Sequence, residues 1–228
     1  MFSRSQIFSL FGAMALLWAL GACADVDGVD EEVPLPTELA DEDYVYPDEH
    51  YETMDRMRAR RPAIRDLLAT QVVGEGANGQ LDLPPDGNTV TSDDVALMEA
   101  DNADRVALFE SFARGTQIKD LRSQVPDITE QVVTQVCEDL GDFVCDAIAL
   151  EQRLLVALEA AINGEPLANN DDVDGVIREI VQPIVDVTLG VGVKLQAEFN
   201  AKLFAKKYAE TAPSRSWVEV GSEWRQKK

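Results

Sequence analysis

The chain has 228 residues, of which 46% are hydrophobic, enough to fill the core of one domain or of a domain with a large insertion. Its 42 acidic and 20 basic side chains give a formal net charge of −22 at pH 7. Such an acidic chain excludes nucleic acids and anionic lipid headgroups as general partners.

The first 22 residues have the features of a targeting segment. Arg4 precedes an almost continuous apolar run from Ile7 to Leu20, and two small residues then lead to Cys23. The run is too short to span a bilayer comfortably, which disfavours a transmembrane anchor. The pattern resembles a bacterial lipoprotein signal peptide, with an ordinary signal peptide as the alternative. This resemblance implies removal of residues 1–22 and lipidation of Cys23, whose acyl chains would contact the membrane. Ala24, in place of a retaining aspartate, implies a lipid-anchored outer-membrane protein that faces the periplasm.

Residues 23–47 are predicted to form an acidic tether. Residues 25–49 carry eleven acidic side chains and no basic one, together with three prolines. So much like charge and so little apolar content favour an extended spacer. A calcium site at Asp25, Asp27 and Asp30 is the alternative. The folded domain is expected to cover residues 48–228, with a helical insertion at about 115–199.

Several helices are predicted along this domain. The first runs from about Asp48 to Val73, where Pro62 either kinks it or marks the start of its second half. A segment rich in glycine and proline follows, and the next helix begins near Ser92. It ends at Gly115 or continues toward Leu121. A further helix opens at Pro126-Asp127.

Another helix is expected from about Asp142 to Asn163, with Gly164 as its stop. Its inward residues would be Ile148, Leu155, Leu158 and Ile162. Residues 185–195 alternate as in a strand but also fit a helix, which we favour. Residues 216–224 predict a hairpin or an extended ending. The expected fold is therefore mostly α, a small helical domain with a helical insertion and a short extended or hairpin C-terminal tail.

Two cysteines remain if Cys23 is lipidated. On one continuous helix, Cys137 and Cys145 would lie roughly 12 Å apart, too far for a disulfide. Gly141 between them permits a chain reversal, and an oxidising periplasm favours a bond. We predict a disulfide, with two buried free thiols as the alternative.

Residues that could carry chemistry are few. His50 is the only histidine, which disfavours a histidine-based triad or metal site. Asn170, Asp172, Asp174 and Gly175 match the opening of a calcium loop, but its twelfth position is Val181 instead of the required Glu. We therefore predict no catalytic residue, no metal site and no cofactor. A carboxylate-based hydrolase, with Glu75 as its most obvious candidate, is the enzymatic alternative.

Three blocks of residues carry a resemblance to a family. Val73, Gly74, Glu75, Asn78, Gly79 and Leu81 form the first block, and Asn102-Ala103, Arg105, Phe109 and Ala113 form the second. The third runs from Lys207 to Trp224 and includes Pro213, Trp217 and Gly221. In this order they resemble the YdbL-like family of small periplasmic proteins, a domain of unknown function. The chain departs from that family in its lipoprotein signal, in about 85 additional residues and in Ser214 at a position usually held by glycine.

The resemblance implies a non-catalytic accessory or chaperone-like role. Family members are often encoded beside a large AsmA-like protein that bridges the two membranes and a small outer-membrane lipoprotein, which are the partners we expect. Residues 73–81 and the tail with Trp217 and Trp224 would make the contact. The glycines suit a loop in which Glu75 bonds backbone amides and Asn102 and Arg105 clamp the turn. A lipoprotein that binds a lipid or another small ligand in a helical cavity is the alternative function.

Overall fold

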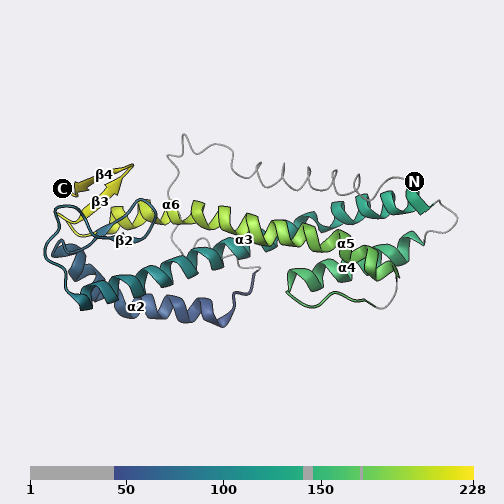
Figure 1. The fold of residues 1–228 in the computed structure, drawn as a ribbon, viewed down its shortest axis with the longest axis horizontal. Coiled ribbons are helices and arrows are strands. Elements are labelled where there is room, and N and C mark those ends of the chain that lie inside the picture. Colours follow the sequence, from purple (N-terminus) through teal and green to yellow (C-terminus); the bar gives the residue numbers. More distant parts are fainter. Residues whose placement is uncertain (1–43, 141–145, 170–171) are drawn as a thin grey trace. The chain divides into compact units, whose positions relative to one another are not determined.

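The computed structural model describes residues 44–140, 146–169 and 172–228. The described chain is mostly helical, as expected, with a small four-stranded sheet (Figure 1). It divides into two compact units. The sheet unit comprises the described residues up to Gly115 together with Lys194–Lys228, and the helical unit comprises the described residues of Thr116–Val193. The second range lies close to the predicted insertion at 115–199.

The first helix of the sheet unit is α2, Asp48–Ala69. Pro47 precedes it in an extended conformation. Asp48 and Glu49 lie in its first turn, where negatively charged side chains interact favourably with the helix dipole. The helix continues through Pro62. It ends at a left-handed Gln71, φ 62°, with the Val72 N–H donating to the Leu67 carbonyl at 3.0 Å. This is a Schellman ending in which glutamine stands at the position that glycine usually holds.

Four short strands form the sheet. They are β1 (Gly74–Glu75), β2 (Leu81–Asp82), β3 (Trp217–Val220) and β4 (Glu223–Gln226), in the order β2-β1-β3-β4. The predicted C-terminal hairpin is present as β3 and β4, which pair antiparallel. Strand β1 pairs antiparallel with β2 and parallel with β3. The sequence predicted a loop where β1 and β2 lie. A strand of two residues is too short to show the alternation of apolar and polar side chains that identifies strands.

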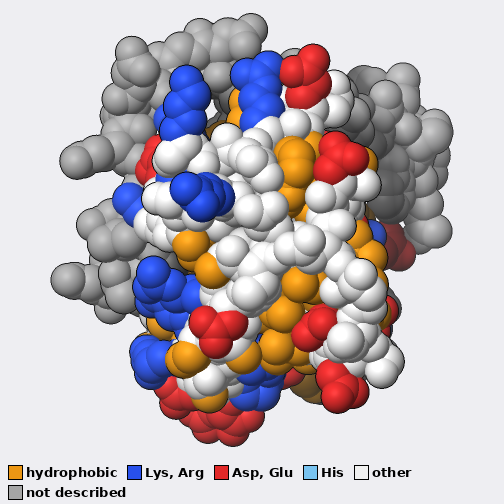
Figure 2. All heavy atoms as spheres, turned by 90° about the vertical axis from the view of Figure 1, so that its left-hand side faces the viewer, with side chains coloured by type: hydrophobic (Ala, Val, Ile, Leu, Met, Phe, Trp, Pro, Cys, Tyr) orange, Lys and Arg blue, Asp and Glu red, His pale blue; other side chains and the backbone are white. Residues whose placement is uncertain are grey.

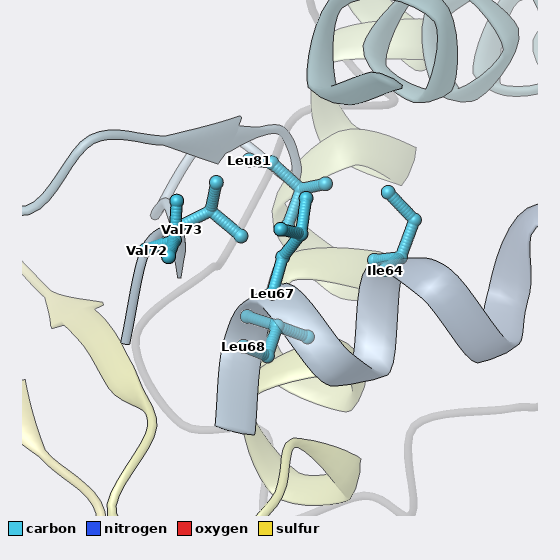
Figure 3. Close-up of a cluster of buried hydrophobic side chains, with 6 residues drawn as sticks. All are labelled: Ile64, Leu67, Leu68, Val72, Val73 and Leu81. Carbon is cyan, nitrogen blue, oxygen red and sulfur yellow. The ribbon is translucent and has the colours of Figure 1, made fainter. Parts of the chain in front are cut away.

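Two hydrophobic clusters support the sheet unit. The first packs the end of α2 against the β1–β2 hairpin (Figure 3), through Ile64, Leu67, Leu68, Val72, Val73 and Leu81. The second joins α3 (Ser92–Leu140) and α6 (Val193–Thr211) to the segment before α2, through Tyr46, Leu108, Phe109, Phe112 and Phe204. The first block of the family resemblance therefore packs on a hydrophobic core.

Tyr46 shows that the predicted tether boundary at residue 47 is too late. Its side chain is only 4% exposed, stacks on the His50 ring at 4.2 Å and meets the Phe112 ring edge-on at 5.7 Å. The His50 Nδ1 atom lies 2.8 Å from the Ser111 hydroxyl. The folded part thus already includes residues 44–47, because two tyrosines supply the apolar area that the acidic residues before them lack.

Helix α3 is continuous from Ser92 to Leu140. The predicted interruption after Gly115 or Leu121 and the new start at Pro126 are therefore wrong. Proline in a helix interior removes one hydrogen bond. Burial of Leu121, Val125 and Val132 on either side of Pro126 offsets this loss. Packing outweighs the local signal.

Helix α4, Ala147–Ile162, opens the described second half of the helical unit. The Asp146 carboxylate accepts a hydrogen bond from the Ala149 N–H at 3.1 Å, and Gly164 follows the helix at φ 75°, the stop that was predicted. The prediction that Ile148 points inward is wrong, because it is 70% exposed. Leu158 and Ile162 are buried as predicted, whereas Leu155 is only partly buried. Leu150 and Leu154 complete the buried stripe.

The ambiguous stretch is helical. Helix α5, Asp172–Val185, leads into a π-helical segment, η1, at Asp186–Gly192, which continues into α6. The preferred prediction for residues 185–195 is thus confirmed, and the strand alternative is wrong. Gly192 permits close approach of the Gln117 side chain, whose Oε1 atom would lie 2.6 Å from an added Cβ.

Candidate functional site

The three blocks of the family resemblance meet in the sheet unit. The first block forms the β1–β2 hairpin, the second lies on the N-terminal part of α3, and the third forms the end of α6 with β3 and β4. Side chains from α3 reach the hairpin, and β3 pairs directly with β1. We name the residues of the first block with their partners on α3, α6 and β3 the hairpin cluster.

Asn102 closes the outer edge of β2. Its Oδ1 atom accepts a hydrogen bond from the Leu81 N–H at 2.7 Å, and its amide donates to the Leu81 carbonyl at 2.8 Å. One side-chain amide thereby satisfies both backbone groups of the same strand residue, as a neighbouring strand would. The expectation that Asn102 clamps this hairpin is confirmed by these bonds.

Arg105 lies at the centre of the hairpin cluster and is 4% exposed. It donates to the two Glu75 carboxylate oxygens at 2.6 and 3.2 Å, to Asp101 at 2.8 Å and to the Gly79 carbonyl at 3.1 Å. Its guanidinium carbon lies 4.1 Å from the centre of the Tyr208 ring. A buried charge is tolerated only when it is paired and hydrogen-bonded, and Arg105 meets both conditions.

The surroundings of Arg105 keep its guanidinium charged. Burial alone would lower the pKa of Arg105, but the adjacent Glu75 carboxylate raises it above its ordinary value. Burial raises the pKa of Tyr208 to about 12, so its hydroxyl stays protonated at neutral pH. The cluster therefore places a permanent cation between two carboxylates and an aromatic ring.

Two further arginines extend the ion pairs toward α2. Arg56 contacts Asp104 at 2.7 Å, and Arg60 contacts both Asp104 and Asp101. Partial burial works to raise the pKa of Asp104, but the hydrogen bonds from both arginines outweigh it and lower the pKa. The basic face of α2 thus pairs in part with α3.

The hairpin turn is held by a residue that the sequence analysis overlooked. Glu75 was expected to bond loop amides, but its carboxylate binds Arg105. The Glu219 carboxylate on β3 takes that role and accepts a hydrogen bond from the Ala77 N–H at 2.9 Å. Within the turn, the Asn78 side chain accepts from the Gln80 N–H at 3.0 Å. Because Glu219 is 142 positions away from Ala77, no local pattern indicated this contact.

Two glycines of the cluster allow close packing. Gly79 has φ 77°, a backbone conformation that residues with a side chain rarely adopt. Gly74 lies beneath the Trp224 ring and beside Trp217, both of which would overlap a Cβ at that position. The structure thus brings together all eight residues that the sequence analysis assigned to partner binding or loop structure: Gly74, Glu75, Asn78, Gly79, Asn102, Arg105, Trp217 and Trp224.

Other residues singled out in the sequence analysis lie elsewhere. Cys23, Asp25, Asp27, Asp30, Cys145 and Asn170 lie outside the described residues, so the disulfide between Cys137 and Cys145 and the lipidation of Cys23 stay predictions. Asp174 is buried on α5 and pairs with Arg153. Within the described ranges, no group of three or more His, Cys, Asp or Glu side chains could hold a metal ion.

The residues of this region that the sequence analysis overlooked are Asp101, Asp104, Tyr208 and Glu219. Asp101 had a usable signal, because it lies four positions before Arg105 on the same helix face. Asp104 directly precedes Arg105 on α3 but pairs with α2, whereas Tyr208 and Glu219 come from elements distant in the sequence. The resulting arrangement is a rigid hairpin whose charged groups pair within the fold.

No family model, curated protein or solved structure matches this chain. The resemblance to the YdbL-like family therefore stays a prediction drawn from the three blocks.

Proposed function

We propose that this protein is a non-catalytic, accessory or chaperone-like lipoprotein of the bacterial envelope. Its partner would be an AsmA-like protein that takes part in lipid transport between membranes, together with a small lipoprotein. The observation that carries this proposal is the convergence of all three blocks of the family resemblance on one hairpin cluster, around the Glu75–Arg105 ion pair.

The cluster suits a binding surface more than a reacting site. Arg105 donates to two carboxylates and one carbonyl, and Asn102 uses both its acceptor and its donor on Leu81. Because the polar atoms of Arg105 and Asn102 are used in bonds within the fold, these side chains hold the hairpin in place. The exposed Asn78 and the partly exposed Ala77 and Gln80 at the turn, together with the neighbouring strands β3 and β4, would then contact the partner.

The proposed location rests on the N-terminal sequence. Lipidation at Cys23 would anchor the protein to the outer membrane, with the folded units in the periplasm. Among the helices of the described ranges, none combines the length and hydrophobicity needed to cross a bilayer.

The test is a pull-down of the tagged, full-length, lipidated protein from gently solubilised envelopes, followed by mass spectrometry. We expect stoichiometric recovery of a large AsmA-like protein with the wild type and a clear loss with Trp224→Ala. A matched control is Val156→Ala on the helical unit, where the side chain is 71% exposed and far from the cluster in the sequence. An empty pull-down, repeated after crosslinking, would overturn the proposal and shift attention to binding of a lipid or another small ligand.

A further inference from the structure

The two edges of the small sheet differ in their backbone hydrogen bonds. At the β2 edge, the Asn102 side chain takes both the N–H and the carbonyl of Leu81. At the opposite edge, β4 is the last strand in the sheet order. Within the residues that the structure describes, no strand continues the sheet beyond β4.

The backbone groups that face this open edge can be identified. The Lys227 N–H donates to the Ser216 carbonyl, and the Lys227 carbonyl accepts from the Arg215 N–H, both at 2.8 Å. Both backbone groups of Lys227 therefore face the β3 side. In antiparallel pairs this direction alternates from residue to residue. The backbone groups of Gln226 and Trp224 thus point away from β3, toward the open edge.

The surroundings of this edge are basic in an otherwise acidic chain. Residues 194–228 carry eight Lys and Arg side chains and only four Asp and Glu, although the whole chain has a net charge of −22. Lys and Arg side chains are spread over the side of the sheet unit that Figure 2 shows, among acidic and apolar ones. The basic residues within or directly beside the β3–β4 hairpin are Arg215, Arg225, Lys227 and Lys228.

The acidic groups of the hairpin are already engaged. Glu219 accepts a hydrogen bond from Ala77, and Glu223 and Arg225 pair with each other at 2.7 Å. The Lys227 ammonium donates to the carbonyls of Glu210 and Ala212 and keeps its charge. Lys228 and Arg215 are exposed. The edge therefore offers two features together, outward backbone groups for strand pairing and a positive local charge.

We propose that the open edge of β4 binds an extended, acidic segment of a partner protein, which adds to the sheet as a fifth strand. Backbone hydrogen bonds to Trp224 and Gln226 would supply the pairing, and the basic side chains would select an acidic sequence. This inference rests on the proposed accessory function and specifies the chemistry of the segment that binds.

Synthetic peptides test the edge directly. Three eight-residue probes are compared with the full-length protein in detergent: alternating Val and Glu, alternating Val and Lys, and an acidic peptide in which proline replaces every valine. We expect binding of the Val-Glu peptide alone, because proline removes the N–H groups that strand pairing needs. Equal binding of the acidic proline peptide, or no binding of the Val-Glu peptide up to about 1 mM, would overturn the inference.

A pair of substitutions separates backbone pairing from side-chain effects. Gln226→Pro removes an outward N–H, whereas Gln226→Ala retains it and also removes the side chain. We expect Gln226→Ala to bind the Val-Glu peptide like the wild type and Gln226→Pro to bind about tenfold more weakly, as for the loss of one hydrogen bond. Equal affinity of the two variants would overturn the inference.

A measurement on the wild type covers the case in which Gln226→Pro fails to fold. Hydrogen exchange at the Trp224 and Gln226 amides should slow when the Val-Glu peptide is added, while exchange at Arg225, which faces β3, should change little. The pull-down separates this inference from the proposed function. Undiminished recovery of the AsmA-like partner by Gln226→Pro would reject strand addition at β4 and leave the proposed accessory function standing. Binding of the Val-Glu peptide without recovery of a partner would support strand addition and reject the accessory function.

Discussion

Two side chains of this protein fill roles that other structural features usually fill. Asn102 completes the β2 edge with one amide, and Gln71 ends α2 at a position that favours glycine. Both features have consequences for stability that differ in sign. The first should be costly to remove, and the second should be improved by substitution.

Removing the Asn102 amide should destabilise the sheet unit. Asn102→Ala leaves the N–H and carbonyl of Leu81 without their partner, and we expect a loss of about 2 kcal/mol in the free energy of unfolding. Asn78→Ala is the matched control, because that side chain is exposed and accepts a single local hydrogen bond. Urea titration followed by circular dichroism measures both. Equal losses in the two variants would contradict the clamp.

Replacing Gln71 with glycine should stabilise the protein. Gln71 has φ 62°, which glycine adopts without strain, so Gln71→Gly should raise the free energy of unfolding by up to about 1 kcal/mol. Thr70→Gly is the control, since Thr70 has φ −84° and gains nothing from glycine. A lower thermal midpoint for Gln71→Gly than for the wild type would show that its side-chain bond to Gln226 outweighs the strain.

At the scale of elements, long-range packing decides where the helices begin and end. Helix α3 passes through Gly115 and Pro126, two residues that usually interrupt helices. At Gly115 a Cβ would lie 2.9 Å from the Tyr44 ring and 3.0 Å from the Tyr46 hydroxyl. This glycine therefore serves contact with the segment before α2 and does not end a helix.

Two glycine substitutions within helices should have opposite effects. Gly175 on α5 has nothing within 4 Å of an added Cβ, so Gly175→Ala should stabilise the protein by about 0.5–1 kcal/mol. Gly115→Ala gains the same helix propensity but must displace two tyrosine rings, and we expect a net loss. Thermal unfolding of both variants measures the difference. A stabilising Gly115→Ala would show that residues 44–46 are not tightly packed.

The contact between His50 and the tyrosines should make stability depend on pH. Burial lowers the pKa of His50 below its ordinary 6.5, so the folded state favours the neutral ring. Its contribution is complete above pH 6.5 and is lost as the pH falls from 6.5 toward the lowered value. His50→Asn should lack this part of the pH dependence. The difference between the two urea titrations at pH 7.5 and 5.5 measures it, and identical pH profiles would contradict the burial of a neutral ring.

Much of the fold could be predicted, and the part that could not has a common cause. The helical class, the stop at Gly164 and the C-terminal hairpin follow from local patterns around those residues. The parallel pairing of β1 with β3 and the bond from Ala77 to Glu219 join residues more than 140 positions apart. For the candidate site, Asn102 and Arg105 were placed on the hairpin from their spacing, but their partners Asp101 and Tyr208 were not.

At the scale of the whole molecule, the dominant property is the net charge of −22. Like charges repel one another in the compact state, and salt screens this repulsion. Raising the NaCl concentration from about 0.01 M to about 0.1 M shortens the screening length from about 30 Å to about 10 Å, so the thermal midpoint should rise. A falling midpoint would instead show that exposed ion pairs such as Arg58–Asp55 dominate the salt response.

The position of the tryptophans gives the two units separate optical signals. The chain has three tryptophans, and Trp18 lies in the predicted signal peptide. If residues 1–22 are removed as predicted, only Trp217 and Trp224 remain, on neighbouring strands of the sheet unit. Intrinsic fluorescence then reports the unfolding of the sheet unit alone, whereas helical circular dichroism reports both units. Comparing the two curves in one titration would therefore show whether the units unfold together.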